Sequence, residues 1–88
     1  MPGSAGLPLF YETRLALGTA YMSLGDYPNA VSSLMDANEA AKTLGRLDWL
    51  FSSGKLIMLT FLYTRNYDIA ERMLNEFMQF DRSKVPGN

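Results

Sequence analysis

The sequence predicts an all-α fold of four helices, arranged as two antiparallel helical hairpins that stack on one another. Apolar residues recur at steps of three and four along most of the chain, which is the spacing of one helix face. Gly25 and Gly45 interrupt this spacing and are typical of helix ends. The strongest observation is an internal repeat, in which a Tyr-x-x-Ala-x-x-x-Leu pattern returns after 67 − 27 = 40 residues. The residues are Tyr27, Ala30 and Leu34, then Tyr67, Ala70 and Leu74.

The first two helices are expected near residues 9–24 and 28–44. Residues 1–7 are rich in Gly and small side chains, and they predict a disordered segment before an ordered domain 8–81. Helical spacing in the first helix is carried by Phe10, Leu17, Tyr21 and Leu24. Asp26 is placed to cap the second helix, and Pro28 suits its first turn. The second helix carries one apolar stripe, made of Ala30, Leu34, Ala37, Ala41 and Leu44.

The last two helices are expected near residues 48–64 and 67–81, followed by a tail 82–88. Asp48 and Asn66 are the expected caps. The run from Leu56 to Tyr63 is apolar almost all round, and by itself it could be a buried strand. The repeat favours a helix, because Tyr21 maps onto Phe61 with the same offset of 40.

The composition argues against several classes of function. The chain has 88 residues, a net charge of −1 and scattered basic residues, which does not fit a nucleic-acid-binding surface. It contains no Cys and no His, so the usual zinc and thiolate sites are excluded. The longest apolar run is far shorter than the roughly 20 residues that span a bilayer. An intracellular, cytoplasmic protein is therefore the default expectation.

The first hairpin resembles the tetratricopeptide repeat closely, and the resemblance, to a long-period variety of about 40 residues, covers roughly residues 11–80. The matching positions share the family's small and large residues at the same spacing. They are Leu17-Gly18-Thr19-Ala20-Tyr21, the turn Gly25-Asp26-Tyr27, and then Ala30, Leu34 and Ala37. Gly18 and Ala30 are expected to let the two helices of the hairpin approach, while Tyr21 and Leu34 fill the space between them.

The chain departs from this family at three points. Arg14 stands in place of the usual Trp, Lys42 in place of the closing Pro, and the period is 40 residues rather than about 34. Met58 occupies the position in the second hairpin where the family has Gly. Its bulk should splay the third and fourth helices or demand a repacked contact.

The resemblance implies that the first helix of each hairpin lines a concave groove that binds a partner. The positions that match the family's groove are largely apolar, with one acid and one base. They are Glu12, Leu15, Thr19, Met22 and Ser23, then Ser52, Lys55, Leu59, Leu62 and Tyr63. Members that clamp a terminal carboxylate use Lys and Asn there, so an apolar or helical ligand fits better. Leu59, Leu62 and Tyr63 fit burial in the core equally well.

Catalysis is not expected, because no nucleophile has an obvious base and no carboxylate pair is placed for acid–base chemistry. No cofactor, metal or small-molecule substrate is expected either. Trp49 could anchor a partner, although its place beside the turn between the hairpins favours a core position more strongly.

The sequence therefore predicts a non-catalytic module that binds a protein or peptide. The alternative is a structural role, as a self-associating unit or as a segment of a longer scaffold. Two hairpins without a polar capping helix should leave apolar side chains of the last helix in water. These side chains, Met73, Phe77, Met78 and Phe80, favour a homodimer as the simplest way to cover them.

Overall fold

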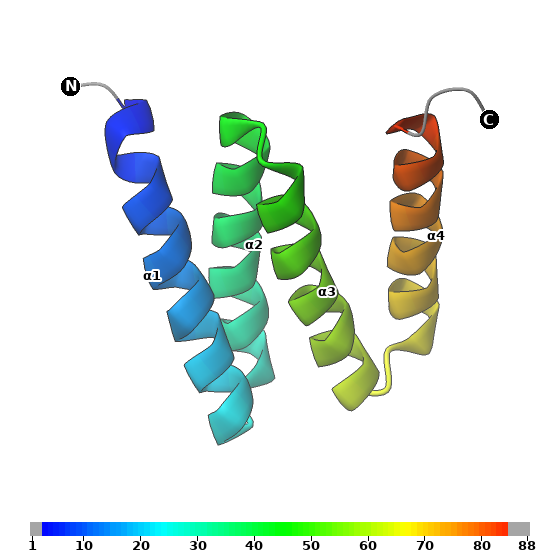
Figure 1. Cartoon of the computed structure of the whole chain (residues 1–88). Coiled ribbons are helices and arrows are strands. Elements are labelled where there is room, and N and C mark those ends of the chain that lie inside the picture. Colours follow the sequence, from blue (N-terminus) through cyan, green and yellow to red (C-terminus); the bar gives the residue numbers. More distant parts are fainter. Residues whose placement is uncertain (1–2, 85–88) are drawn as a thin grey trace.

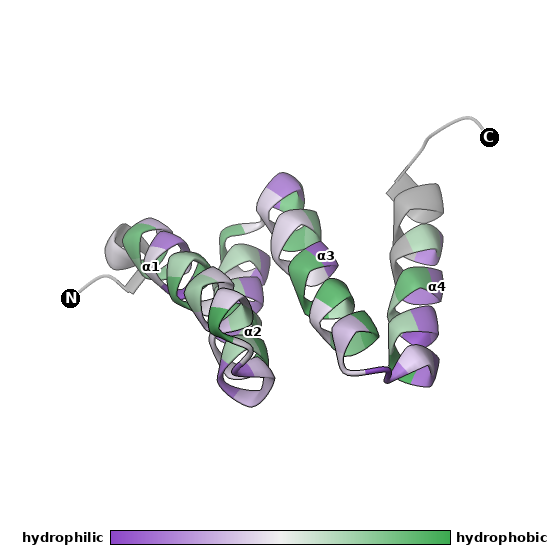
Figure 2. Cartoon of the chain, turned by 90° about the horizontal axis from the view of Figure 1, so that it is seen from below, coloured by the Kyte–Doolittle hydropathy of each residue, from purple (hydrophilic) through white to green (hydrophobic). Residues whose placement is uncertain are grey.

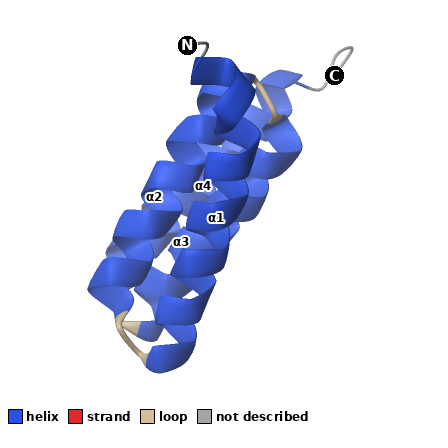
Figure 3. Cartoon of the chain, turned by 90° about the vertical axis from the view of Figure 1, so that its left-hand side faces the viewer, coloured by secondary structure: helices blue, strands red, loops and turns tan. Residues whose placement is uncertain are grey.

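The computed structural model describes the backbone of residues 3–84 and the side chains of residues 6–76, 78 and 79. Four helices, joined by short loops, occupy this range (Figures 1 and 3). They are α1 (Gly3–Leu24), α2 (Tyr27–Leu44), α3 (Leu47–Tyr63) and α4 (Tyr67–Lys84). The all-α prediction is confirmed, and the run Leu56–Tyr63 belongs to a helix rather than a strand.

The helices form a row in which each packs against the next, and α1 also contacts α3 (Figure 1). The Cα trace measures 44 × 40 × 14 Å, so the molecule is a flat stack of two antiparallel hairpins. α1 and α4 lie at opposite ends of the row (Figure 1). One side of each of these two helices therefore has no helix packed against it.

The helix boundaries differ from the expected ones mainly at the two ends of the chain. α1 begins at Gly3, so residues 3–7 extend the first helix instead of preceding it. Leu7 packs against the core, which gives this extra turn a reason to form. α4 continues to Lys84, three residues beyond its expected end.

The expected caps were correct for α2 and wrong for α3. Asp26 accepts a hydrogen bond from the backbone N–H of Asn29, and Gly45 ends α2 in a left-handed conformation. The residue that caps α3 is Arg46, and it makes no side-chain capping bond. Asp48 lies inside the first turn, where the positive end of the helix dipole stabilises its carboxylate. The carboxylate also pairs with Arg46.

All but one of the buried hydrophobic residues in the described part of the chain lie in the first three helices. Ala30, Leu34, Ala37 and Ala41 of the predicted α2 stripe are buried, whereas Leu44 is half-buried. A cluster of Tyr11 with the alanines of α2 receives Leu7, Leu15, Trp49 and Leu50 from the neighbouring helices. Among the described side chains of α4, Ala70 alone is buried. The second hairpin is thus held far less firmly than the first.

Gly18 and Met58 explain this difference between the hairpins. A Cβ atom on Gly18 would lie 2.6 Å from Cγ of Leu34 and 3.3 Å from the carbonyl oxygen of Ala30, so α1 and α2 approach closely there. Met58, at the equivalent position of α3, lines an open hollow of about 380 Å³ between α3 and α4. Figures 1 and 2 show these two helices diverging from their loop. The splaying expected from Met58 is confirmed.

The three loops share one hydrogen-bonding pattern that repeats every 20 residues. Backbone N–H groups of Asp26, Arg46 and Asn66 donate to carbonyls five residues earlier, at 2.7–3.1 Å. In each loop the preceding residue has a positive φ, which is the Schellman ending of a helix. That residue is glycine at 25 and 45, but at position 65 it is Arg65, with φ 65°.

Replacing Arg65 with glycine should stabilise the protein. The left-handed conformation costs a residue with a Cβ atom about 1–2 kcal/mol, and glycine loses part of this gain through its freedom in the unfolded chain. We expect Arg65→Gly to raise the free energy of unfolding in urea by about 0.5–1 kcal/mol. Gly45→Ala is the matched reverse change, because no atom lies within 4 Å of the added Cβ. It should lower stability by a similar amount, and the opposite sign in either variant would refute the explanation by strain.

Candidate functional site

The face formed by α1 and α3 carries an open hollow of about 440 Å³, here called the α1–α3 hollow. It is lined mainly by apolar and aromatic side chains, with a carboxylate and two hydroxyls. The residues are Tyr11, Glu12, Leu15, Ala16, Thr19, Trp49 and Ser52. α1 contributes five of these positions and the N-terminal half of α3 the other two, so the hollow depends on how the two hairpins stack.

An aromatic stack fixes the two hairpins together at this hollow. The rings of Tyr11 and Trp49 are nearly parallel, with their centroids 4.4 Å apart. The Tyr11 hydroxyl also donates a hydrogen bond of 3.1 Å to the backbone oxygen of Trp49. Burial, and after it the charge of Asp48, raises the pKa of the Tyr11 phenol. The phenol therefore stays protonated and keeps its role as a donor.

Arg46 lies on Trp49 as well. Its guanidinium carbon is 4.0 Å from the centroid of the Trp49 ring, and since Tyr11 occupies one face of that ring, Arg46 covers the other. Two hydrogen bonds, of 2.9 and 3.2 Å, join Arg46 to Asp48 and lower the pKa of that carboxyl. Trp49 is thus held between two side chains. The prediction that it plugs the junction of the hairpins is confirmed.

A second set of hydrogen bonds positions α3 against α2. The side-chain amide of Asn38 donates to the hydroxyl of Ser53 at 2.9 Å and to the backbone oxygen of Leu50 at 3.1 Å. Ser53 in turn donates to the carbonyls of its own helix. These bonds satisfy polar groups that stacking of the hairpins removes from water. The position of α3, which forms one wall of the α1–α3 hollow, is therefore fixed by packing and by hydrogen bonds.

The structure brings together only part of the predicted groove. Glu12, Leu15 and Thr19 line the α1–α3 hollow, and Ser52 faces them from α3. Met22 is half-buried and does not line it. The part of the predicted groove that is formed by Glu12, Leu15, Thr19 and Ser52 is thus a hollow in the structure.

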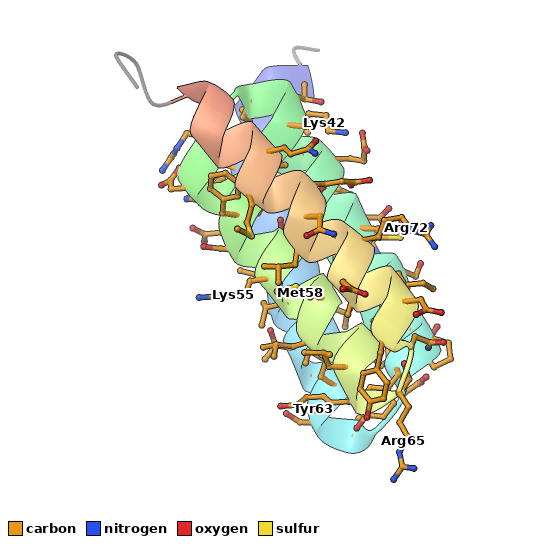
Figure 4. The ribbon with its side chains drawn as sticks, turned by 90° about the vertical axis from the view of Figure 1, so that its right-hand side faces the viewer. Lys42, Lys55, Met58, Tyr63, Arg65 and Arg72 are labelled. Carbon is orange, nitrogen blue, oxygen red and sulfur yellow. The ribbon has the colours of Figure 1, made fainter. Side chains whose placement is uncertain are left out.

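The predicted groove residues farther along α3 are dispersed. Leu59 is half-buried and Lys55 is exposed, and neither lines the hollow. Leu62 lies on another side of α3, where it lines the hollow between α3 and α4 with Met58. Tyr63, labelled in Figure 4, is exposed. Its ring centroid lies 6.2 Å from that of Tyr27. The alternative that Leu62 and Tyr63 belong to the core is wrong.

The polar groups of the α1–α3 hollow differ in whether they already have a hydrogen-bonding partner. The Thr19 hydroxyl donates to the carbonyl of Leu15 in its own helix, so its proton is engaged. In the described part of the chain, no hydrogen bond or ion pair engages the exposed carboxylate of Glu12. A ligand with a cationic group beside an apolar surface would complement this arrangement.

The residues predicted for self-association all lie on α4. Met73 is half-buried and Met78 is exposed. Phe77 and Phe80 belong to the helix, but their side chains lie outside the described residues. Leu74, which the prediction did not include, is also exposed and lines the hollow between α3 and α4.

No cluster of three or more carboxylates that could hold a metal ion occurs in the described part of the chain. Within the same part, no helix is both long enough and apolar enough to cross a membrane. A scan of protein-family models, a search of curated proteins and a search of solved structures each find no match to this chain.

Tyr11 and Ala16 line the α1–α3 hollow but were not among the predicted groove residues. Tyr11, Leu15 and Gly18 follow one another at steps of four and three residues, and they mark the inward face of α1. The more conspicuous set of Phe10, Leu17 and Leu24 is instead exposed. The steps from Tyr11 to Gly18 were the signal that could have identified Tyr11.

Proposed function

We propose that this chain is a non-catalytic protein-binding module of the tetratricopeptide type, and that its α1–α3 hollow receives an amphipathic helical segment of a partner protein. The observation that carries the proposal is the hollow itself. Its walls are largely apolar, its floor is fixed by the stack of Tyr11 on Trp49, and it has one free carboxylate at Glu12.

The hollow favours a peptide ligand because of the shape and chemistry of its walls. Leu15, Ala16 and Trp49 offer apolar contact along a face shared by two helices, which suits the apolar side of a third helix. The carboxylate of Glu12 would pair with a Lys or Arg that flanks this apolar side. Such a pair sets the orientation of the ligand more than its affinity, because the carboxylate is exposed.

A structural role, in self-association or within a larger scaffold, is the second candidate. It is favoured by the apolar side chains of Leu74 and Met78, which are exposed on α4. The two roles use different surfaces, so one chain can serve both.

Substitution of Ala16 tests the binding role. Ala16 is exposed and lines the hollow, so Ala16→Arg should fill it without disturbing the core. The probe is a displayed library of random amphipathic helices, selected on the immobilised domain. We expect enrichment of helices that combine an apolar face with a flanking Lys or Arg. Ala16→Arg should weaken binding of the selected peptides at least tenfold, which corresponds to about 1.4 kcal/mol.

Two further variants make this result specific. Ser32→Arg places the same side chain on an exposed position of α2 and should leave binding unchanged. Glu12→Lys should shift the selected peptides from basic to acidic flanking residues. Selection without enrichment, or equal binding by Ala16→Arg, would refute the proposed function.

A further inference from the structure

α1 leaves uncovered a stripe that its counterpart in the second hairpin buries. The stripe consists of Phe10, Thr13, Leu17 and Ala20, all of which are exposed. Adding the repeat offset of 40 gives Leu50, Ser53, Ile57 and Thr60 of α3. Ser53, Ile57 and Thr60 are buried, and α3 uses this side to pack against the first hairpin. Leu17 is 38% exposed, whereas its counterpart Ile57 is 5% exposed.

The opposite end of the molecule shows the complementary difference. α2 receives α3 along a stripe that includes Tyr27, Val31 and Asn38, since Tyr27 contacts Tyr63 and Asn38 bonds to Ser53. Leu34, which follows at helical spacing, packs against Gly18 of α1 and is 0% exposed. The equivalent positions of α4 are Tyr67, Glu71, Leu74 and Met78, and all four are exposed. Leu74 is 44% exposed at the position where Leu34 is fully buried.

These two uncovered faces correspond to the two halves of one interface that the chain already forms within itself. We propose that a second copy of the chain docks its α1 on the α3–α4 hairpin in the way that α3 docks on the α1–α2 hairpin. The two faces lie at opposite ends of the row of helices, with α1 at one end and α4 at the other (Figure 1; Figure 4 shows the α4 end). Successive copies therefore join head to tail.

The register of this interface follows from the internal one. Asn38 reaches Leu50 and Ser53 within the chain, so Met78 of one copy faces Phe10 and Thr13 of the next. The hydrogen bonds that Asn38 makes within the chain are thereby replaced by an apolar contact between Met78 and Phe10. Both of these side chains are exposed in the single chain. Arg14 borders this stripe: its guanidinium carbon lies 5.1 Å from the centroid of the Phe10 ring, and it reaches Asp36 of its own hairpin at 3.7 Å, so a docked copy contacts Arg14 as well as Phe10.

Head-to-tail docking differs from the two-fold homodimer that the sequence alone favours. A two-fold dimer would cover α4 with α4 and leave the stripe on α1 in water. The head-to-tail contact is heterologous, and each added copy presents a new free face, so association does not stop at two chains. One residue of the receiving stripe limits its strength, because Glu71 stands where the template has Val31.

Two blocking variants and their mixture test the proposal. Leu17→Glu places a charge on the docking stripe, and Met78→Glu places one on the receiving stripe. Both positions are exposed, so helix content and melting temperature should stay near those of the wild type. Sedimentation equilibrium should show a wild-type mass that rises with concentration beyond twice 9.9 kDa, and a mass of 9.9 kDa for each variant alone.

The mixture distinguishes this arrangement from the alternatives. Leu17→Glu keeps an intact receiving stripe and Met78→Glu keeps an intact docking stripe, so equimolar amounts should form a 1:1 complex and nothing larger. A wild-type chain that remains monomeric up to about 1 mM would overturn the proposal. So would a complex that stops at two chains and is unaffected by Leu17→Glu, or a mixture that stays monomeric.

A gain of affinity provides an independent check. Glu71→Val restores the residue type of the internal template and should tighten association about tenfold, because a carboxylate no longer has to be desolvated. Glu76→Val makes the same change on another side of α4 and should leave the association constant within about twofold. Equal effects of the two substitutions would show that net charge, rather than the receiving stripe, controls association.

Discussion

Leu34→Ala should be among the most destabilising substitutions in this chain, whereas Leu74→Ala should have little effect. The two leucines occupy equivalent positions of the 40-residue repeat, but Leu34 is fully buried and Leu74 lies at an open hollow. Removing a buried leucine side chain typically costs about 2–5 kcal/mol, because the lost contacts leave a cavity. We expect this loss in the free energy of unfolding for Leu34→Ala, and less than about 1 kcal/mol for Leu74→Ala.

Urea unfolding followed by circular dichroism measures both values. The experiment should be run at the lowest practical protein concentration, because association of copies would bury Leu74 and enlarge its effect. Met35→Ala on the exposed side of α2 is a suitable control for loss of an apolar side chain in the first hairpin. Similar losses at positions 34 and 74 would contradict the unequal packing of the two hairpins.

Much of this fold follows from short-range signals in the sequence. Gly25 and Gly45 mark the first two loops, because a left-handed residue that ends a helix is most often glycine. The third loop has no such signal, since Arg65 takes the left-handed conformation, and only the repeat places it. The N-terminal turn of α1 could not be predicted, because its cause is the tertiary contact of Leu7 with the core.

The candidate site could also be predicted in part from signals in the sequence. The resemblance placed Glu12, Leu15 and Thr19 on one face, and the structure confirms that they share a hollow. It also placed Leu62 on that face, whereas the structure turns it toward α4. The exposure of Phe10 and Leu17 could not be read from periodicity, because an apolar stripe shows that a face seeks a partner but not whether the same chain supplies one.

Gly18→Ala should destabilise the protein even though alanine is the better helix former. In a helix interior this exchange usually gains about 1 kcal/mol. Here the new methyl group would lie 2.6 Å from both Cγ and Cδ2 of Leu34, which is fully buried, so one of the two side chains has to shift within the core. Overpacking of this kind costs about 1–3 kcal/mol. We therefore expect a net loss of stability of up to about 2 kcal/mol in urea unfolding.

The sign of this effect should reverse when Leu34 is already truncated. In a Leu34→Ala background the atoms that oppose the new methyl group are gone, so Gly18→Ala should recover about 1 kcal/mol from helix propensity. Gly6→Ala is the matched control in the same helix, because nothing lies within 4 Å of its added Cβ, and it should be neutral or stabilising in both backgrounds. If Gly18→Ala lowers stability equally with and without Leu34, then the backbone contact with the Ala30 carbonyl, and not the Leu34 side chain, requires glycine at this position.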